Sequence, residues 1–367
     1  MLCNHWLHSF LFQSFVLYSL LLLGDCKVFE PCPPREASYK ETRQLFVATC
    51  DTRREWKEFM AMRVWNVTSY GLRKKDNLQM KNVCYGENWG KHGFLTKPMI
   101  YLDYLKSLPK ASPQGGKVYA ILMDSDTFWS VSNLTSIWAK FDCARGEKEV
   151  VLGTEMSCWV GRYCNQEDLY RWYNGTENSP SYSPFVNSGV VMGEVTKITK
   201  MLDFVVSHAD DYFIEKYKGK MKFDDQYALA DYAIKVAPED IMLDHHQQLL
   251  ASCSIHAPPV PEEDGWPFVC KTIHGNISRS CVDYTTYMFR HNYFIINKED
   301  CTAKRNLQTR LKLYDQMATL APDPIIWHGN GVGKRIFSGL GDRSFKCFLA
   351  QRNMTVDDYD YIKMGYE

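Results

Sequence analysis

The stretch Lys117-Val118-Tyr119-Ala120-Ile121-Leu122-Met123-Asp124-Ser125-Asp126 decides the fold that we expect for this chain. Its apolar run is typical of a buried strand, and such a strand often ends at a ligand crevice in an open α/β sheet. Asp124 and Asp126 stand at that end, where two carboxylates repel each other and are costly to desolvate unless a cation neutralises them. A divalent ion bound by these carboxylates and by substrate phosphates would offset the repulsion and the desolvation cost, so the pattern indicates a nucleotide-sugar site. An ordinary turn is the alternative interpretation of Asp-Ser-Asp.

Strands and amphipathic helices alternate along the chain around this stretch. Apolar runs predict strands at Gln44–Cys50, Val150–Gly153 and Phe185–Gly193. The helical spacing of apolar residues predicts helices at Glu55–Trp65, Lys97–Leu108, Thr196–Ala209, Asp224–Ala233 and Leu307–Leu320. This alternation implies an α/β fold with a mostly parallel, Rossmann-like central sheet flanked by helices. The irregular insertion Trp159–Pro184 is a candidate acceptor or lid loop.

The composition limits the class of protein. The 367 residues carry 43 Lys and Arg against 43 Asp and Glu, so the formal charge is zero. A general nucleic-acid binder would be strongly basic, and no nucleic-acid partner is expected. We expect a signal peptide or membrane anchor at 1–26, a stem at 27–42, one catalytic domain at 43–347 and a polar tail at 348–367.

The N-terminal segment predicts the compartment. From Trp6 to Leu23 the chain is almost continuously apolar, which is long for a signal-peptide core and just long enough to span a bilayer. Gly24 and Cys26 suit cleavage before Lys27, so a cleaved signal and a type II anchor both stay open. Either places the rest of the chain in the lumen of the endoplasmic reticulum or Golgi, with a membrane contact only through the possible anchor.

The cysteines and the glycosylation sequons agree with that compartment. Of 13 cysteines, 11 lie beyond Cys26, a number that is ordinary for an oxidising compartment. Cys158 with Cys164, and Cys270 with Cys281, are close enough to close small loops, and no Cys/His spacing matches a structural zinc site. The Asn-x-Ser/Thr sequons stand at Asn66, Asn133, Asn174, Asn276 and Asn353.

Three further segments carry residues with chemistry. In Asn187-Ser188-Gly189 the glycine has no side chain, so a sugar ring could approach the backbone there, although the segment is also a common turn. Phe223-Asp224-Asp225-Gln226 places two acids at the start of a helix, where capping is the alternative role. In His328-Gly329-Asn330-Gly331, followed by Gly333-Lys334, the glycine backbone can face anions and the lysine adds a cation. A lone histidine is usually an ordinary buried residue. Because His328 stands beside the glycines and the lysine, we interpret it as a ligand at a metal-diphosphate site.

With these segments the chain resembles the glycosyltransferase domain of the procollagen lysyl hydroxylase (PLOD) family over roughly residues 43–340, and more distantly collagen galactosyltransferases. The His-Gly-Asn-Gly segment with its following lysine is the most specific part of the likeness. The resemblance implies a GT-A fold, a UDP-sugar donor, and Mn2+ held by Asp124, Asp126 and His328. This chain differs from the family in two ways. The family's metal-binding acids are spaced by two residues, whereas Asp124 and Asp126 are spaced by one, and the family's acidic cluster is longer than Asp224-Asp225. No hydroxylase iron site follows residue 340, so a collagen acceptor is not implied.

The expected activity is Mn2+-dependent transfer of a hexose from a UDP-sugar to a hydroxyl acceptor on a protein or glycan. Asp225 or Asp224 would contact the sugar or act as base or nucleophile. The residues expected to contact the donor are Thr49, Asp124, Ser125, Asn187, Ser188, Gly189, Gly329, Asn330, Gly331 and Lys334. Two other functions stay open: a catalytically silent sugar- or nucleotide-binding module of the same fold, and a nucleotide-sugar hydrolase.

Overall fold

The computed structural model describes residues 43–51, 68–69, 71–73, 76, 78–84, 87, 93–155, 185–216, 220–244, 247–252, 294–299, 301–305, 324–329 and 334–353. The expected N-terminal segment and stem, the helices expected at Glu55–Trp65 and Leu307–Leu320, and the insertion Trp159–Pro184 lie outside these residues. Within the described part, no helix combines the length and the apolar character that a membrane span requires.

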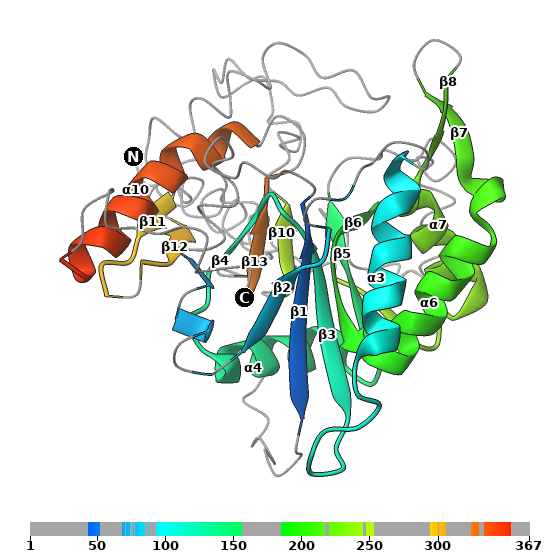
Figure 1. Cartoon of the computed structure of the whole chain (residues 1–367), viewed down its shortest axis with the longest axis horizontal. Helices are drawn as coiled ribbons and strands as arrows, with labels where there is room; N and C mark the ends of the chain where they lie inside the picture. The colour runs from blue at the N-terminus through cyan, green and yellow to red at the C-terminus, as the bar shows by residue number, and fades with distance from the viewer. Residues whose placement is uncertain are drawn as a thin grey trace, which may run out of the picture. The chain divides into compact units, whose positions relative to one another are not determined.

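A six-stranded sheet forms the centre of the described fold, in the strand order β2-β1-β3-β6-β5-β9 (Figure 1). Its strands are β1 (Gln44–Cys50), β2 (Gln79–Asn82), β3 (Val118–Asp124), β5 (Val150–Glu155), β6 (Phe185–Glu194) and β9 (Ile241–Leu243). β1 is parallel to β2 and β3, and β5 is parallel to β9. Only β6 runs against its sheet neighbours, being antiparallel to both β3 and β5. The expected α/β class with a mostly parallel sheet is confirmed.

Helices cover both faces of this sheet because its strands bury side chains on both sides. Alternate residues of β3 belong to two hydrophobic clusters, Val118, Ala120 and Leu122 to the first and Tyr119, Ile121 and Met123 to the second. The first cluster contains residues of α3 (Thr96–Ser107), α6 (Val195–Ser207) and α7 (Asp225–Asp231). The second contains residues of α4 (Leu134–Arg145) and α10 (Lys334–Gln351). A strand covered on both faces must be apolar throughout, which explains the uninterrupted run before Asp124.

The helix ends differ slightly from those expected. α3 and α6 stand where the sequence predicts them, with ends shifted by one or two residues. α7 begins one residue late because the Asp224 side chain caps it, accepting a hydrogen bond from Tyr227 N at 3.0 Å. α10 continues past residue 347, and its Phe348 and Leu349 are buried in the second cluster. The fold therefore extends beyond the domain boundary expected before residue 348.

A second sheet joins three distant parts of the chain in the order β10 (Leu250–Ser252), β13 (Ile326–His328) and β4 (Thr127–Trp129). The central strand β13 is parallel to β10 and antiparallel to β4. β4 starts directly after Asp126, and Thr127 is the register partner of His328. This pairing carries His328 to the end of β3, although 202 residues separate it from Asp126.

The remaining elements are short. They are the hairpins β7 (Phe213–Lys216) with β8 (Lys220–Phe223) and β11 (Phe294–Ile296) with β12 (Ala303–Arg305), and the helical turns η2 (Gly93–Leu95), η4 (Ala209–Tyr212) and η5 (Tyr232–Val236). Two disulfides are described, Cys50–Cys84 and Cys301–Cys347. They support the disulfide interpretation of the cysteines, while the pairs expected within 158–164 and 270–281 lie outside the described residues.

Candidate metal and diphosphate site

Two carboxylates and an imidazole meet where β3 ends. Asp124 is the last residue of β3, and the Thr127 hydroxyl donates to its carbonyl, which closes the turn that presents Asp126. His328 Nε2 lies 3.1 Å from Asp126 Oδ1 and 3.6 Å from Asp124 Oδ2. One ligand atom from each of the three residues lies within 4.8 Å of the others, a spacing that one metal ion can bridge. The expected grouping of Asp124, Asp126 and His328 is thus present in space.

The charge state of His328 is governed by these acids. Burial lowers the pKa of the imidazole, but the Asp126 carboxylate, with a smaller contribution from Asp124, outweighs it and raises the pKa above its ordinary value. A bare site therefore favours a proton on His328, which a metal ion would have to displace.

Asn187 fixes which nitrogen of His328 faces the acids. Its side-chain oxygen must be the atom that faces Gly189, because the Gly189 N–H, 2.7 Å away, can only donate. The same oxygen lies 3.2 Å from His328 Nδ1, so Nδ1 carries the hydrogen of that contact. In the neutral imidazole Nε2 then presents its lone pair toward Asp124 and Asp126, as a metal ligand must.

Gly189 makes room for the histidine. A Cβ at position 189 would lie 2.4 Å from two atoms of the His328 ring and 2.6 Å from Asn187 Oδ1. The sequence suggested that this missing side chain admits a sugar ring, whereas the structure fills the space with the imidazole. Asn187 and Gly189 therefore contribute to the candidate metal site by positioning His328.

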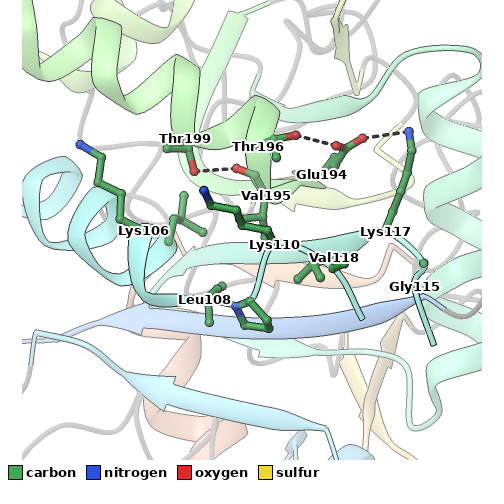
Figure 2. Close-up of a pocket in the computed structure, with 14 residues that line it drawn as sticks. Lys106, Leu108, Lys110, Gly115, Lys117, Val118, Glu194, Val195, Thr196 and Thr199 are labelled. Atoms are coloured by element: carbon green, nitrogen blue, oxygen red, sulfur yellow. Dashed lines mark hydrogen bonds and ion pairs between the residues drawn. The ribbon is translucent and has the colours of Figure 1, made fainter. Parts of the chain in front are cut away.

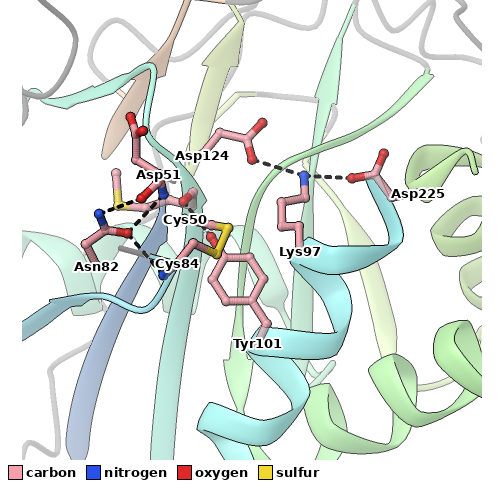
Figure 3. The surroundings of a disulfide bond; sticks show 9 residues. Cys50, Asp51, Asn82, Cys84, Lys97, Tyr101, Asp124 and Asp225 are labelled. Carbon is pink, nitrogen blue, oxygen red and sulfur yellow. Dashed lines mark hydrogen bonds and ion pairs between the residues drawn. A yellow bond between two sulfur atoms is a disulfide. The ribbon is translucent and has the colours of Figure 1, made fainter. Parts of the chain in front are cut away.

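Lys97, which the sequence analysis did not single out, links the metal acids to α7. Its Nζ lies 3.0 Å from Asp124 Oδ1 and 2.6 Å from Asp225 Oδ2 (Figure 3). Burial opposes the charge on Lys97, but Asp124 and Asp225 outweigh it and raise the pKa of the amine well above its ordinary value. Lys97 shares the buried stripe of α3 with Tyr101 and Leu105, so a charged residue at core spacing was the available signal.

The two acids at the start of α7 have different positions. Asp224 is buried and caps the helix, the alternative role considered for it. Asp225 faces the site: burial raises the pKa of its carboxyl, but Lys97 and a hydrogen bond with Ser188 outweigh this and lower the pKa. The next residue, Gln226, donates to Glu155 Oε1 at 2.9 Å and to the Val186 carbonyl at 3.0 Å. Glu155, a fully buried acid at the end of β5, is a further residue that the sequence analysis missed.

The end of β1 forms a second polar corner beside the acids. The backbone N–H of Asp51 donates to Asn82 Oδ1 and the Asn82 amide donates back to the Asp51 carbonyl, both at 2.9 Å, next to the Cys50–Cys84 disulfide (Figure 3). Thr49 is fully buried here, and its hydroxyl has no hydrogen-bond partner within the described residues. The expected contact of Thr49 with a nucleoside stays a prediction.

The structure reaches only part of the predicted diphosphate segment. Gly329 N donates to the Asp126 carbonyl at 2.9 Å, which ties the segment to the acids. Ser125 is buried in the turn between Asp124 and Asp126. Asn330 and Gly331 lie outside the described residues, and of Lys334 only the backbone, at the start of α10, is described.

A pocket away from the acids is also described. A cavity of about 870 Å³ opens at the start of β3 and of α6, between Leu108, Val118 and Val195 (Figure 2). It is at the opposite end of β3 from Asp124. Lys117 beside it already pairs with Glu149 at 3.0 Å and Glu194 at 2.8 Å. We assign the chemistry to the clustered acids because the cavity holds no comparable group of ligands among the described residues.

No protein-family model matches the chain, and neither does any curated protein. Among solved structures the chain is similar to a glycosyltransferase involved in the glycosylation of the major capsid of PBCV-1, at 8% identity and a TM-score of 0.38, over 83% of this chain and 98% of that one. It is also similar to mouse xyloside xylosyltransferase 1 in its apo form, at 13% identity and a TM-score of 0.40, over 78% of this chain and 98% of that one. Likenesses this distant carry no argument about function.

Proposed function

We propose that this chain is a metal-dependent glycosyltransferase of the GT-A type that transfers a hexose from a UDP-sugar to a hydroxyl acceptor on a protein or glycan. The cluster of Asp124, Asp126 and His328 at the end of β3 is the observation that carries the proposal. The N-terminal apolar segment and the cysteines support a place in the lumen of the secretory pathway. The PLOD-like resemblance stays a prediction.

The donor atoms fit a divalent cation such as Mn2+. Carboxylate oxygens with one imidazole nitrogen suit Mn2+, which prefers oxygen ligands and accepts nitrogen. Asp126 and His328 are buried while the Asp124 side chain is 26% exposed, so the cluster is open toward solvent on one side. When bound, the ion would act as a Lewis acid on the departing diphosphate.

The remaining side chains would position the donor. Asn187 keeps Nε2 of His328 directed at the acids. Lys97 and Ser188 hold the Asp225 carboxylate ionised beside the cluster, where it could contact the transferred sugar or act on the reacting centre. Gly329, Asn330, Gly331 and Lys334 would add backbone N–H groups and a cation around the diphosphate.

Removing the metal ligands tests the proposal. In purified protein, Asp126→Asn and His328→Gln should each lower Mn2+-dependent hydrolysis of UDP-sugars by more than about 100-fold, beyond what outer-shell changes usually cause. Hydrolysis is measured because it needs no knowledge of the acceptor. Asp203→Asn is the control, since its exposed carboxylate pairs with Lys106 on the helix surface.

The outcomes also separate the alternatives. Full hydrolysis in both ligand variants, with unchanged melting curves, would contradict the metal assignment. A rise in melting temperature with UDP and Mn2+ but no turnover across a panel of donors would favour a silent binding module. Release of free sugar at one rate with and without any acceptor would favour a hydrolase.

A further inference from the structure

Lys97 is a fixed cation inside the candidate metal site. Its ammonium has three protons, and three oxygens surround it: Asp225 Oδ2 at 2.6 Å, Asp124 Oδ1 at 3.0 Å and Ser188 Oγ at 3.4 Å. Its side chain is only 11% exposed, so water does little to screen its charge. Both acids that it contacts belong to the site proposed above.

The position of Lys97 bears directly on metal binding. The two oxygens of Asp124 face different partners, Oδ1 toward Lys97 and Oδ2 toward His328. A metal ion between Asp126, His328 and Asp124 would therefore share the Asp124 carboxylate with an ammonium. Two cations on one carboxylate repel each other, and the repulsion is strong where the effective dielectric is low.

We propose that Lys97 weakens the binding of a free divalent cation at Asp124, Asp126 and His328, so that firm metal binding requires the donor diphosphate. The inference rests on the proposed function, since it takes these three residues to be the metal site. The diphosphate brings negative charge that offsets the ammonium, and the metal and the nucleotide then bind cooperatively. Lys97 is a positioning residue in this scheme, because it acts through Asp124 and Asp225.

Asp225 modulates the effect. It holds the Lys97 ammonium at a shorter distance than Asp124 does, 2.6 Å against 3.0 Å. With a neutral residue at 225, Lys97 would pair with Asp124 alone and oppose the metal more strongly. The two residues should therefore show opposite effects on metal affinity, and the effect of Asp225 should depend on Lys97.

The test is a titration of Mn2+ into the full chain, with free Mn2+ measured by electron paramagnetic resonance, with and without UDP. We expect Lys97→Met to bind Mn2+ at least tenfold more tightly than wild type without UDP, and to gain less affinity from UDP. Asp225→Asn should bind at least threefold more weakly, and should lose most of that effect in the Lys97→Met background. Lys106→Met is the matched control, because this exposed lysine of α3 pairs only with the exposed Asp203 among the described residues.

The outcomes distinguish a failure of the Lys97 inference from a failure of the proposed metal site. Equal or weaker Mn2+ binding by a folded Lys97→Met variant overturns the inference, as does tighter binding by Lys97→Arg, which keeps the charge. If Lys97→Met does not fold, Asp225→Asn decides, and an affinity not below wild type overturns the inference. Wild-type protein that binds no Mn2+ even with UDP contradicts the proposed metal site itself, which is a different failure.

Discussion

The contact between Gly189 and His328 shows how one absent side chain positions a ligand. The imidazole occupies the volume that a Cβ at 189 would need, and Asn187 holds its far nitrogen. Outer contacts of this kind set the direction of a ligand's lone pair, and changes there commonly alter metal affinity. At the residue scale, the Asn-Ser-Gly segment therefore supports the candidate metal site by orienting His328.

Gly189→Ala tests this arrangement. Its added methyl would lie 2.4 Å from the His328 ring, so the ring must leave the position in which Nε2 lies 3.1 Å from Asp126 Oδ1. We expect Mn2+ affinity in the presence of UDP to fall about tenfold or more. Gly193→Ala is the control, because its methyl would lie 2.7 Å from the Glu149 carbonyl oxygen at the other end of β6. Isothermal titration of both variants should show the loss only for Gly189→Ala, and an equal loss in both would contradict the positioning role.

The sequence predicted the candidate metal ligands but not the residues that contact and orient them. Asp124, Asp126 and His328 could be read from strand ends and local motifs, since each follows an apolar run. Lys97 could not be assigned to the site because its partners, Asp124 and Asp225, are distant in sequence and only tertiary packing brings them to it. The different directions of Asp224 and Asp225 depend on where α7 starts, which a cap decides within one residue.

At the scale of elements, the three-stranded sheet delivers His328, and Asp244 anchors that sheet. The Asp244 carboxylate accepts from the backbone N–H groups of Gln248, Leu249 and Leu250 at 2.8, 2.6 and 2.8 Å. These bonds fix the chain as it enters β10, which pairs with β13. The sequence predicted no such anchor, because a single acid between two short strands has no distinguishing pattern.

Asp244 also predicts a pH dependence of stability. Burial raises the pKa of its carboxyl to about 6 from 3.8, against the opposing effect of the three N–H donors. The folded state therefore binds this proton more tightly than the unfolded state, and its contribution to stability is lost as pH rises from about 4 to about 6. In Asp244→Asn that loss is absent, so wild type relative to the variant should lose up to about 3 kcal/mol between pH 4 and pH 7. Urea unfolding at both pH values measures it, and parallel curves for the two proteins would contradict the assignment.

At the scale of the whole described fold, the sequence predicted the α/β architecture better than the pairing of the cysteines. The alternation of apolar strands and amphipathic helices specified the α/β class, because both faces of the central sheet are covered. The disulfides could not be paired from the sequence, since pairing depends on which strand ends lie together. Cys50 and Cys84 are joined because β1 and β2 are parallel neighbours whose ends meet.

The two described disulfides should contribute similarly to stability but differently to the site. They close loops with sequence separations of 34 and 46 residues, for which the chain-entropy relation gives about 4 kcal/mol each. Cys50 is the register partner of Asp124, and Cys84 lies two residues after Asn82, so the first disulfide holds the polar corner beside the candidate metal ligands. Cys301–Cys347 instead attaches α10 to the segment before β12.

We expect the double variants Cys50→Ser/Cys84→Ser and Cys301→Ser/Cys347→Ser to lose comparable unfolding free energy in urea, while only the first binds UDP with Mn2+ several-fold more weakly. Equal nucleotide affinity in both variants would show that this corner lies outside the donor site.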